Sequence, residues 1–282
     1  MVFGYRRASN PSVKVSILLS LALASTAWGQ VDIQQIVRAS IENYQHDWRE
    51  AMNWAWTQTD VTASEETASD KTEIEVSEIS PLEGTPYERL IGKNGSPLTP
   101  EAQRRENRKY LKTLKERENE SPSEHTARIR RYERERAFIG DIPDAYNFKL
   151  LGNETVDGRP AWVVQMTSRP EFVPSAPHAS MLEHIEGKLW IDEEDVRWAK
   201  AEAHVIDTIS IGWILARIGP GTRFGVHQIR VASGLWMPSR LTIAGIAHVL
   251  LVHARALNEQ LTYSGYYEAG STSAAKPPEA VR

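Results

Sequence analysis

The C-terminal half of the chain constrains the fold most, because it is a succession of short alternating segments separated by turn-forming residues. These segments cover residues 146–151, 161–167, 186–192, 196–207, 223–232, 235–245 and 249–263. Asp157-Gly158-Arg159-Pro160 is a turn signal between the first two, and Asp192-Glu193-Glu194-Asp195 is one between the next two. Consecutive strands with short connections favour an antiparallel meander. The sequence therefore predicts one α+β domain in preference to two separate domains.

The N-terminus has the features of an export signal. Arg6, Arg7 and Lys14 form a basic region, residues 15–24 form an apolar core, and Ala27 and Gly29 are small residues of the kind that precede a cleavage site. We therefore expect residues 1–29 to be a signal peptide cleaved after Gly29, and a periplasmic location. An uncleaved single anchor is the alternative. Twin-arginine export is disfavoured because residues 8–11 lack apolar side chains.

An amphipathic helix is expected to begin the mature chain, with Asp32 as its cap. The apolar residues that share one face of this helix are Ile33, Ile36, Val37, Ile41 and Tyr44. Such a helix has to bury its apolar stripe against a larger element. Alternation then predicts strands at 49–59, 72–79 and 87–91, and the first of these carries Trp54.

A highly charged stretch interrupts the predicted strands. Residues 101–136 contain 12 basic and 8 acidic residues, and helix-start signals occur at Thr99-Pro100 and at Ser121. We expect a helical hairpin inserted at 99–139 and laid on the sheet. A solvated insertion held by ion pairs between neighbouring turns is one interpretation. A mobile lid or a dock for an acidic surface is the other, and nucleic-acid binding is disfavoured because no aromatic platform accompanies the charge.

Composition and motifs exclude several classes of function. The chain has no cysteine, which excludes disulfides, thiol catalysis and cysteine-type zinc sites. The net charge is −4 and becomes −7 without residues 1–29, so the overall field does not attract nucleic acid. The eight histidines show no metal-ligand spacing, and no nucleophile elbow, phosphate-binding loop or dinucleotide fingerprint is present. The sequence therefore predicts a protein that is not an enzyme, with no metal and no cofactor.

The predicted strand at 197–207 has an unusual inner face. Its two alternating sets are Trp198, Lys200, Glu202 and His204, expected to point outward, and Ala199, Ala201, Ala203 and Val205, expected to point inward. Three consecutive alanines on one face leave space above the sheet, and protein interiors do not leave such space empty. The space could be filled by the N-terminal helix, by a helix of the hairpin or by an acyl chain.

The connection at 209–218 is unusually apolar and contains Trp213 and Leu215. Connections normally run over the surface and are polar. This one is therefore expected either to be tucked into the core or to form the rim of a hydrophobic pocket or a membrane contact.

Four short motifs carry a resemblance to a known family. They are Gly158-Arg159-Pro160-Ala161-Trp162, Gly187-Lys188-Leu189-Trp190-Ile191-Asp192, Trp198, and Gly234-Leu235-Trp236-Met237-Pro238. Together they resemble the periplasmic lipoprotein-carrier superfamily (LolA-like), which includes outer-membrane lipoprotein-sorting proteins and the lipid-binding half of a sigma-factor regulator. The resemblance covers roughly residues 145–267. The hairpin at 99–139 is outside the usual pattern and resembles an insertion found in a subgroup of exported bacterial proteins.

The resemblance implies an incomplete antiparallel β-barrel of about ten or eleven strands, curled around helices, with a concave apolar cavity for lipid tails. It implies a carrier-like domain at 30–268, followed by a tail at 269–282 that we expect to be disordered. The implied function is non-covalent binding of a lipid or lipoprotein acyl chain for transport to the outer membrane, with transient membrane contact. The alternative is an envelope sensor or scaffold that binds a protein partner through the helices at 101–136.

The residues expected to line or rim the lipid site contact it by shape and dispersion only. They are Trp54, Leu189, Ile191, Ala201, Ala203, Val205, Trp213 and Leu215.

Overall fold

The structure is a computed structural model that describes residues 32–64, 71–211, 216–249 and 253–270. The expected signal peptide at 1–29 lies outside the described residues, as do Trp213, Leu215 and most of the expected tail at 269–282. In the described ranges, no helix is both long enough and apolar enough to cross a membrane.

The helices of the described residues are α1 (Ile33–Glu50), α2 (Pro100–Glu118), α3 (Pro122–Arg134) and α4 (Ile142–Ala145), with 3-10 turns η1 (Ala51–Asn53), η2 (Ala137–Asp141) and η3 (Ala179–His184). Three of these four α-helices, α1, α2 and α3, begin where the sequence predicts, and the short α4 is not predicted. Asp32 caps α1 by accepting a hydrogen bond from the Gln35 amide at 3.1 Å. Ser121, the predicted start of the second helix, forms a capping box with Glu124 in α3. These caps need only neighbouring residues, which is why the sequence reveals them.

The first helix is longer than predicted, so the strand expected at 49–59 begins only at Trp54. The extension is explained by the partners of its last turns. Asp47 is paired with Arg197, and the ring of Trp48 stacks on Tyr132 at 4.7 Å between centroids. These contacts stabilise helical backbone in a stretch whose local pattern also suits a strand.

The strands form one large antiparallel sheet. They are β1 (Trp54–Ser64), β2 (Lys71–Leu82), β3 (Thr85–Lys93), β4 (Ser96–Pro97), β5 (Tyr146–Val156), β6 (Arg159–Ser168), β7 (Ile185–Asp192), β8 (Trp198–Val205), β9 (Ile209–Ile211), β10 (Ala216–Ile218), β11 (Arg223–Ala232), β12 (Leu235–Val249) and β13 (His253–Glu268). Eleven of them follow the order β4-β3-β2-β1-β13-β12-β11-β8-β7-β6-β5, and the short β9 and β10 pair beside this path.

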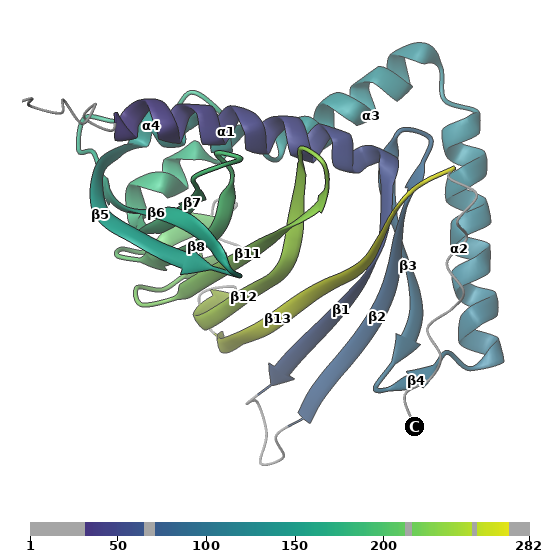
Figure 1. Cartoon of the computed structure of the whole chain (residues 1–282). Helices are drawn as coiled ribbons and strands as arrows, with labels where there is room; N and C mark the ends of the chain where they lie inside the picture. Colours follow the sequence, from purple (N-terminus) through teal and green to yellow (C-terminus); the bar gives the residue numbers. More distant parts are fainter. Residues whose placement is uncertain (1–31, 65–70, 212–215, 250–252, 271–282) are drawn as a thin grey trace, which may run out of the picture. The chain divides into compact units, whose positions relative to one another are not determined.

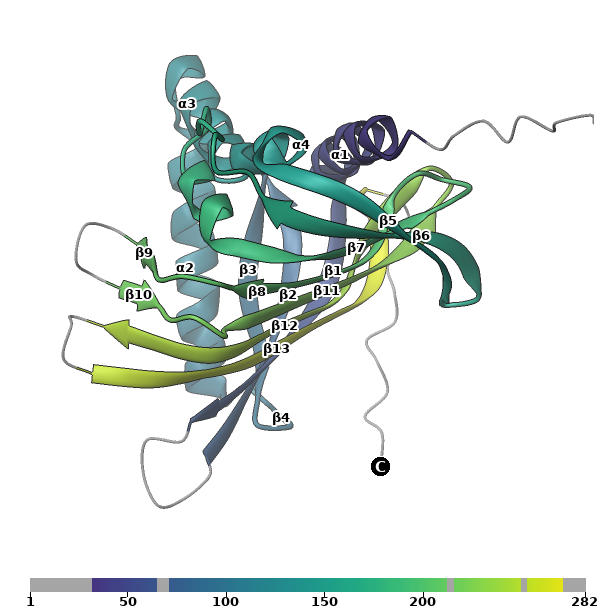
Figure 2. The same cartoon turned by 90° about the vertical axis from the view of Figure 1, so that its left-hand side faces the viewer.

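Two meanders meet at one long-range pairing. β1 pairs with β13, which joins the N-terminal strands to the C-terminal ones. The sheet is curved, and its edge strands β4 and β5 do not pair with each other (Figures 1 and 2). The predicted fold class, an α+β incomplete antiparallel barrel with a helical hairpin, is therefore confirmed.

β12 continues through Gly245, where the sequence analysis ends the strand. A Cβ at this glycine would overlap the side chain of Thr222. The glycine therefore permits a close approach between neighbouring segments and does not form a turn.

Helix α1 packs across one face of the sheet, which we call the α1 face (Figure 1). The main core lies between them and includes Val37 and Ile41 of α1 with Val164, Leu189 and Ile191 of the sheet. As predicted, Ala201, Ala203 and Val205 share this face, while Lys200, Glu202 and His204 lie on the opposite one.

The expectation that Trp198 points outward with Lys200 is wrong. Trp198 is only 7% exposed, stacks on Tyr44 at 4.9 Å and donates a hydrogen bond from Nε1 to Ser40 Oγ at 3.1 Å. The cause is a register shift in the β7–β8 pair. Trp190 pairs with Lys200 and Ile191 with Trp198, so one extra residue reverses the side on which Trp198 lies.

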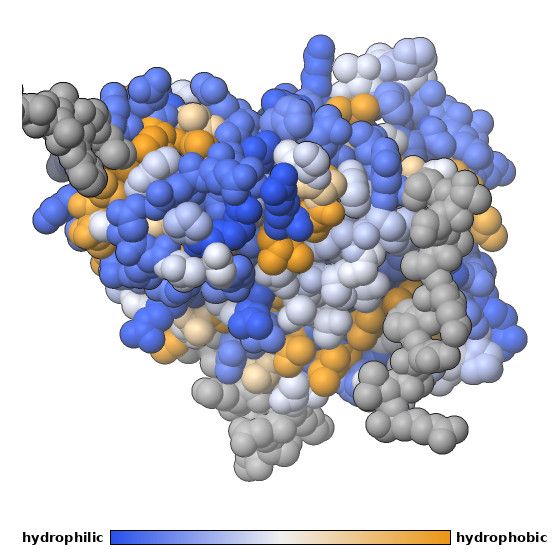
Figure 3. Space-filling model, viewed as in Figure 1, coloured by the Kyte–Doolittle hydropathy of each residue, from blue (hydrophilic) through white to orange (hydrophobic). Residues whose placement is uncertain are grey.

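The hairpin of α2 and α3 is bound to the turn between β2 and β3. Arg117 donates to the Leu82 carbonyl at 2.6 Å, and Arg128 donates to the Glu83 carbonyl and to Thr85 Oγ1, both at 2.7 Å. The surface of α2 and α3 is mostly hydrophilic in Figure 3. The predicted insertion is thus a charged hairpin that packs at one edge of the sheet.

Candidate functional site

Two neighbouring rows of apolar side chains cross the α1 face. The first row is formed by successive cross-strand partners in β7, β8, β11, β12 and β13, namely Leu189, Ala201, Val226, Leu241 and Leu261. The second row is formed by Ala203, Phe224 and Ile243. Cross-strand partners share a face, so these side chains form one continuous surface, called here the apolar rows.

The apolar rows become more exposed with distance from β7. Leu189 is 1% exposed, whereas Val226, Leu241, Ile243 and Leu261 are half-buried. Helix α1 covers the first part of the surface, where Leu189 and Ile191 contact Val37 and Ile41 in the core. The space above Ala201 is therefore filled by the core cluster that includes α1, and the space beside Ala203 and Val205 by Met181 of η3 with Ile209, so the half-buried part of the rows lies beyond these contacts.

The structure places the predicted lining residues in three environments. Leu189, Ile191 and Val205 are fully buried, Ala201 and Ala203 are partly buried beside them, and Trp54 is half-buried at the start of β1. Trp213 and Leu215 lie outside the described residues. The sequence analysis missed Val226, Leu241, Ile243 and Leu261. Their alternation is visible in the sequence, but only the strand register shows that they share a face with Ala201.

Acidic side chains mark the far end of the apolar rows. Asp60 of β1 pairs across from Leu261, and Glu259 of β13 pairs across from Ile243. Burial raises the pKa of Glu259, and the nearby carboxylate of Asp60 raises it further. The apolar surface therefore ends at an acidic rim.

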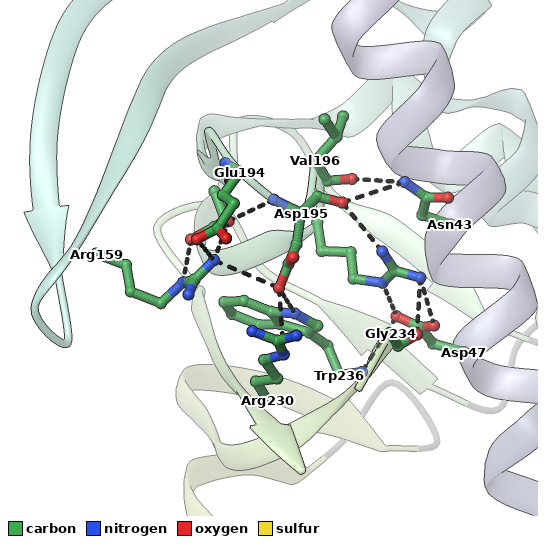
Figure 4. A network of polar contacts seen from close by, with 11 residues as sticks. Asn43, Asp47, Arg159, Glu194, Asp195, Val196, Arg230, Gly234 and Trp236 are labelled. Carbon is green, nitrogen blue, oxygen red and sulfur yellow. Dashed lines mark hydrogen bonds and ion pairs between the residues drawn. The ribbon is translucent and has the colours of Figure 1, made fainter. Parts of the chain in front are cut away.

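A polar network binds α1 to the sheet, and Figure 4 shows it. Arg197 donates from Nε to Asp47 Oδ2 at 2.6 Å, and from Nη2 to the Gly234 carbonyl at 2.8 Å. Asn43 of α1 donates to the Val196 carbonyl at 3.0 Å. The network thus connects the helix to the β7–β8 and β11–β12 turns, which adjoin the motifs that carry the sequence resemblance.

The same turns contain a buried carboxylate. Asp192 is fully buried and accepts from Arg159 Nε at 2.6 Å and from the Asp195 amide at 2.7 Å. Burial alone would raise the pKa of Asp192, but these hydrogen bonds and the Arg159 charge hold it below its usual value. Trp236 Nε1 donates to Asp195 Oδ2 at 2.9 Å. Arg159 also forms ion pairs with Glu194 and Asp195, so this arginine compensates three carboxylates of the acidic turn.

A groove of about 780 Å³ lies on the opposite face of the sheet. Its floor is open because Gly225, Thr242 and Ala244 are small, and charged side chains such as Lys188, Glu202 and Arg223 surround it. Burial lowers the pKa of His227, which also lines it, and the charges of Lys200 and Arg240 lower this pKa further. Met166, Ala203 and Phe224 also line this groove, so its lining is mixed, with charged side chains beside apolar ones.

No protein-family model matches the sequence, and no curated protein matches it. Among solved structures, the chain is similar to a LolA superfamily protein from Nitrosomonas europaea, with 13% identity over 83% of this chain and 91% of that one and a TM-score of 0.32. It is similar to a putative outer membrane lipoprotein-sorting protein domain from Vibrio parahaemolyticus, with 11% identity over 83% and 94% of the chains and a TM-score of 0.34.

A DUF1329 family protein from Desulfovibrio piger is a third similar structure, with 10% identity over 84% of this chain and 95% of that one and a TM-score of 0.31. The architecture itself, an open antiparallel sheet that carries a helix on one face, is established by the strand order and the core described above.

Proposed function

We propose that the protein binds a lipid or lipoprotein acyl chain non-covalently on the apolar rows of the α1 face. The observation that carries the proposal is the continuity of half-buried Val226, Leu241 and Leu261 with Ala201 on one side of the sheet. From β8 to β13 this surface spans three inter-strand spacings, which is about 14 Å. A hydrocarbon chain laid along it removes apolar surface from water on both partners.

The binding needs no catalytic group. Burial of a hydrocarbon chain is favourable by about 0.8 kcal/mol for each CH₂. Half-buried side chains such as Leu241 and Ile243 would gain the same kind of contact. The sequence resemblance suggests that the protein transports such a chain through the periplasm to the outer membrane.

A matched pair of variants on one strand tests the proposal. Ile243 lies on the α1 face, and Ile246 lies on the other face of β12 and is 53% exposed. Ile243→Asn should weaken the binding of decan-1-ol, measured by calorimetry, by about tenfold, because about 1.4 kcal/mol of apolar contact is lost. Ile246→Asn should leave the affinity unchanged. Equal affinities in the two variants, or no decanol binding by the unmodified protein, would refute the proposal.

The natural ligand can be sought directly. Organic extraction of the purified protein followed by mass spectrometry should recover lipid in stoichiometric amount. Ala201→Trp fills the surface between Leu189 and Val226 and should abolish this recovery while circular dichroism stays unchanged. Lipid recovered equally from this variant would count against the assigned surface.

The proposal includes export to the periplasm. The basic region, apolar core and small residues of 1–29 support it. Cell fractionation with N-terminal sequencing of the mature protein should find it in the periplasmic fraction, beginning at Gln30. A cytoplasmic protein that begins at Met1 would contradict it.

A second candidate function is binding of an envelope protein partner at α2. One observation favours it: Leu111 is 60% exposed on an otherwise charged helix. If a partner docks there, cross-linking in cells should capture it with unmodified protein and lose it with Leu111→Glu. Lipid extraction from the same variant should be unaffected.

A further inference from the structure

A small cavity beneath the C-terminal half of α1 has a different chemistry from the apolar rows. It has a volume of about 230 Å³ and lies between α1, which contributes Tyr44 and Trp48, and the end of the hairpin, which contributes Arg136 and Ile139. Its size suits a headgroup and not a whole lipid.

Arg136 is the central group of this cavity. Its guanidinium carbon lies 4.8 Å from the ring centroid of Trp48 and 4.6 Å from that of Tyr132, and these two rings stack on each other. Within the described part of the chain, Arg136 has these cation–π contacts but no side-chain hydrogen bond and no ion pair. Arg117 and Arg128 of the same hairpin are hydrogen-bonded, and Arg130, Arg131 and Arg134 are exposed, whereas Arg136 is half-buried.

The charge around the cavity favours an anion. Arg49, an exposed residue, also lines the cavity. Glu133 is the acidic residue in the cavity lining. Glu133 is exposed and is not within ion-pair distance of Arg136 in the described structure. Among the residues that line the cavity, two arginines against one glutamate leave a net positive charge. A planar guanidinium can bind a carboxylate or a phosphate group through two parallel hydrogen bonds.

Tyr44 lines the cavity and packs against the same core cluster as Ala201 of the apolar rows. Burial raises the pKa of Tyr263 to about 12, the carboxylates of Glu259 and Asp60 raise it further, and the Arg136 charge opposes that rise. Burial likewise raises the pKa of Tyr44, and the Arg136 charge lowers it. Tyr263 is two residues from Leu261 on one strand, and side chains at that spacing share a face.

A second free donor lies on this face. Trp56 is two residues from Gln58, the cross-strand partner of Tyr263, and its ring is 5.9 Å from that of Tyr266. Its Nε1 is buried and makes no hydrogen bond among the described residues. A buried N–H without a partner is costly and is satisfied when an acceptor arrives.

We propose that the cavity at Arg136 binds the acidic headgroup, a carboxylate or a phosphate, of an amphiphile whose hydrocarbon tail lies on the apolar rows. This inference rests on the proposed function and adds the ligand class: an anionic amphiphile, held by its charge at one end and its tail at the other.

Calorimetric titration with probes of one chain length tests it. The probes are decanoate, decyl phosphate and decan-1-ol, with acetate and inorganic phosphate as headgroups without a tail. The unmodified protein should bind the two anionic amphiphiles at least about tenfold more tightly than the alcohol, as expected for hydrogen bonds to a charged group. R136Q should remove this preference and leave the affinity for decanol unchanged. R136K should restore part of it.

R134Q is the matched control, because Arg134 is exposed at the end of α3, two residues before Arg136, and is not among the residues that line the cavity. It should bind every probe as the unmodified protein does. If decanol binds as well as decanoate, or if R134Q and R136Q act alike, the headgroup inference is wrong while the proposed function stands. If no ten-carbon probe binds, both fail. Binding of inorganic phosphate at Arg136 without any amphiphile would also overturn the inference.

Discussion

The ion pair that joins α1 to the sheet should be essential to stability. Asp47 accepts from Arg197 Nε at 2.6 Å and from Nη2 at 3.2 Å, and it also accepts from the Trp236 amide at 3.3 Å. The side chains of Asp47 and Arg197 are only 5% and 14% exposed. Asp47→Asn keeps the shape of the side chain but leaves the arginine charge inside the protein without its carboxylate.

Removal of one partner from a buried pair costs about 3–5 kcal/mol, because the remaining charge is left uncompensated. A protein of this size loses about 2–4 °C of melting temperature per kcal/mol, so we expect Asp47→Asn to melt about 6–20 °C lower. The double variant Asp47→Leu with Arg197→Met removes both charges and should recover most of this loss, since an apolar pair of similar volume is often as stable as a buried ion pair.

Urea unfolding followed by circular dichroism measures these free energies, and a surface pair provides the control. Arg38 and Asp144 are 2.6 Å apart, but their side chains are 50% and 62% exposed. Asp144→Asn should therefore cost at most about 1 kcal/mol. A similar small loss for Asp47→Asn, or a double variant less stable than the single one, would refute the assignment of Asp47 and Arg197 as a buried pair.

Three further predictions concern the sheet. Leu189→Ala should lower the free energy of unfolding in urea by about 2–5 kcal/mol through a cavity beneath α1, whereas Leu111→Ala on the surface should change it by less than about 0.5 kcal/mol. Gly187→Ala should lower it by about 1–3 kcal/mol, because its Cβ would overlap the Glu202 carbonyl oxygen, and an unchanged value would contradict the close strand approach. The folded-state pKa of Asp192 is depressed, so its contribution to stability is present above its unfolded pKa of about 3.9 and is lost as pH falls. In melting curves recorded across pH, Asp192→Asn should reduce the fall in melting temperature at low pH. An equally steep fall in the variant would count against this role of Asp192.

Local patterns predict the elements of this fold well. Asp32 and Ser121 cap helices through residues three positions away, and Asp157-Gly158 makes the turn between β5 and β6. Such signals act within one turn of backbone, so they can be recognised in the sequence alone. The motif at 187–192 is likewise a run of adjacent residues, so its resemblance to the LolA-like pattern can be recognised in the sequence alone.

Trp198 shows where local reasoning fails. Strict alternation places it outside, but a single extra residue in the β7–β8 register turns it inward onto Tyr44. Arg136 is a second example, because it stands in a run of charged residues that all look alike in the sequence. Its neighbours Trp48 and Tyr132 make it distinctive only after α1 and α3 have packed together.

Periodicity, caps and composition were sufficient to predict an antiparallel α+β protein with a charged hairpin and no thiol chemistry. The tertiary structure alone decided which apolar residues α1 covers, which remain half-buried from β11 to β13, and which arginine is half-buried against aromatic rings. The physical reason is distance along the chain. Strand register and helix packing are set by contacts between residues far apart in sequence, and no pattern within a few residues records them.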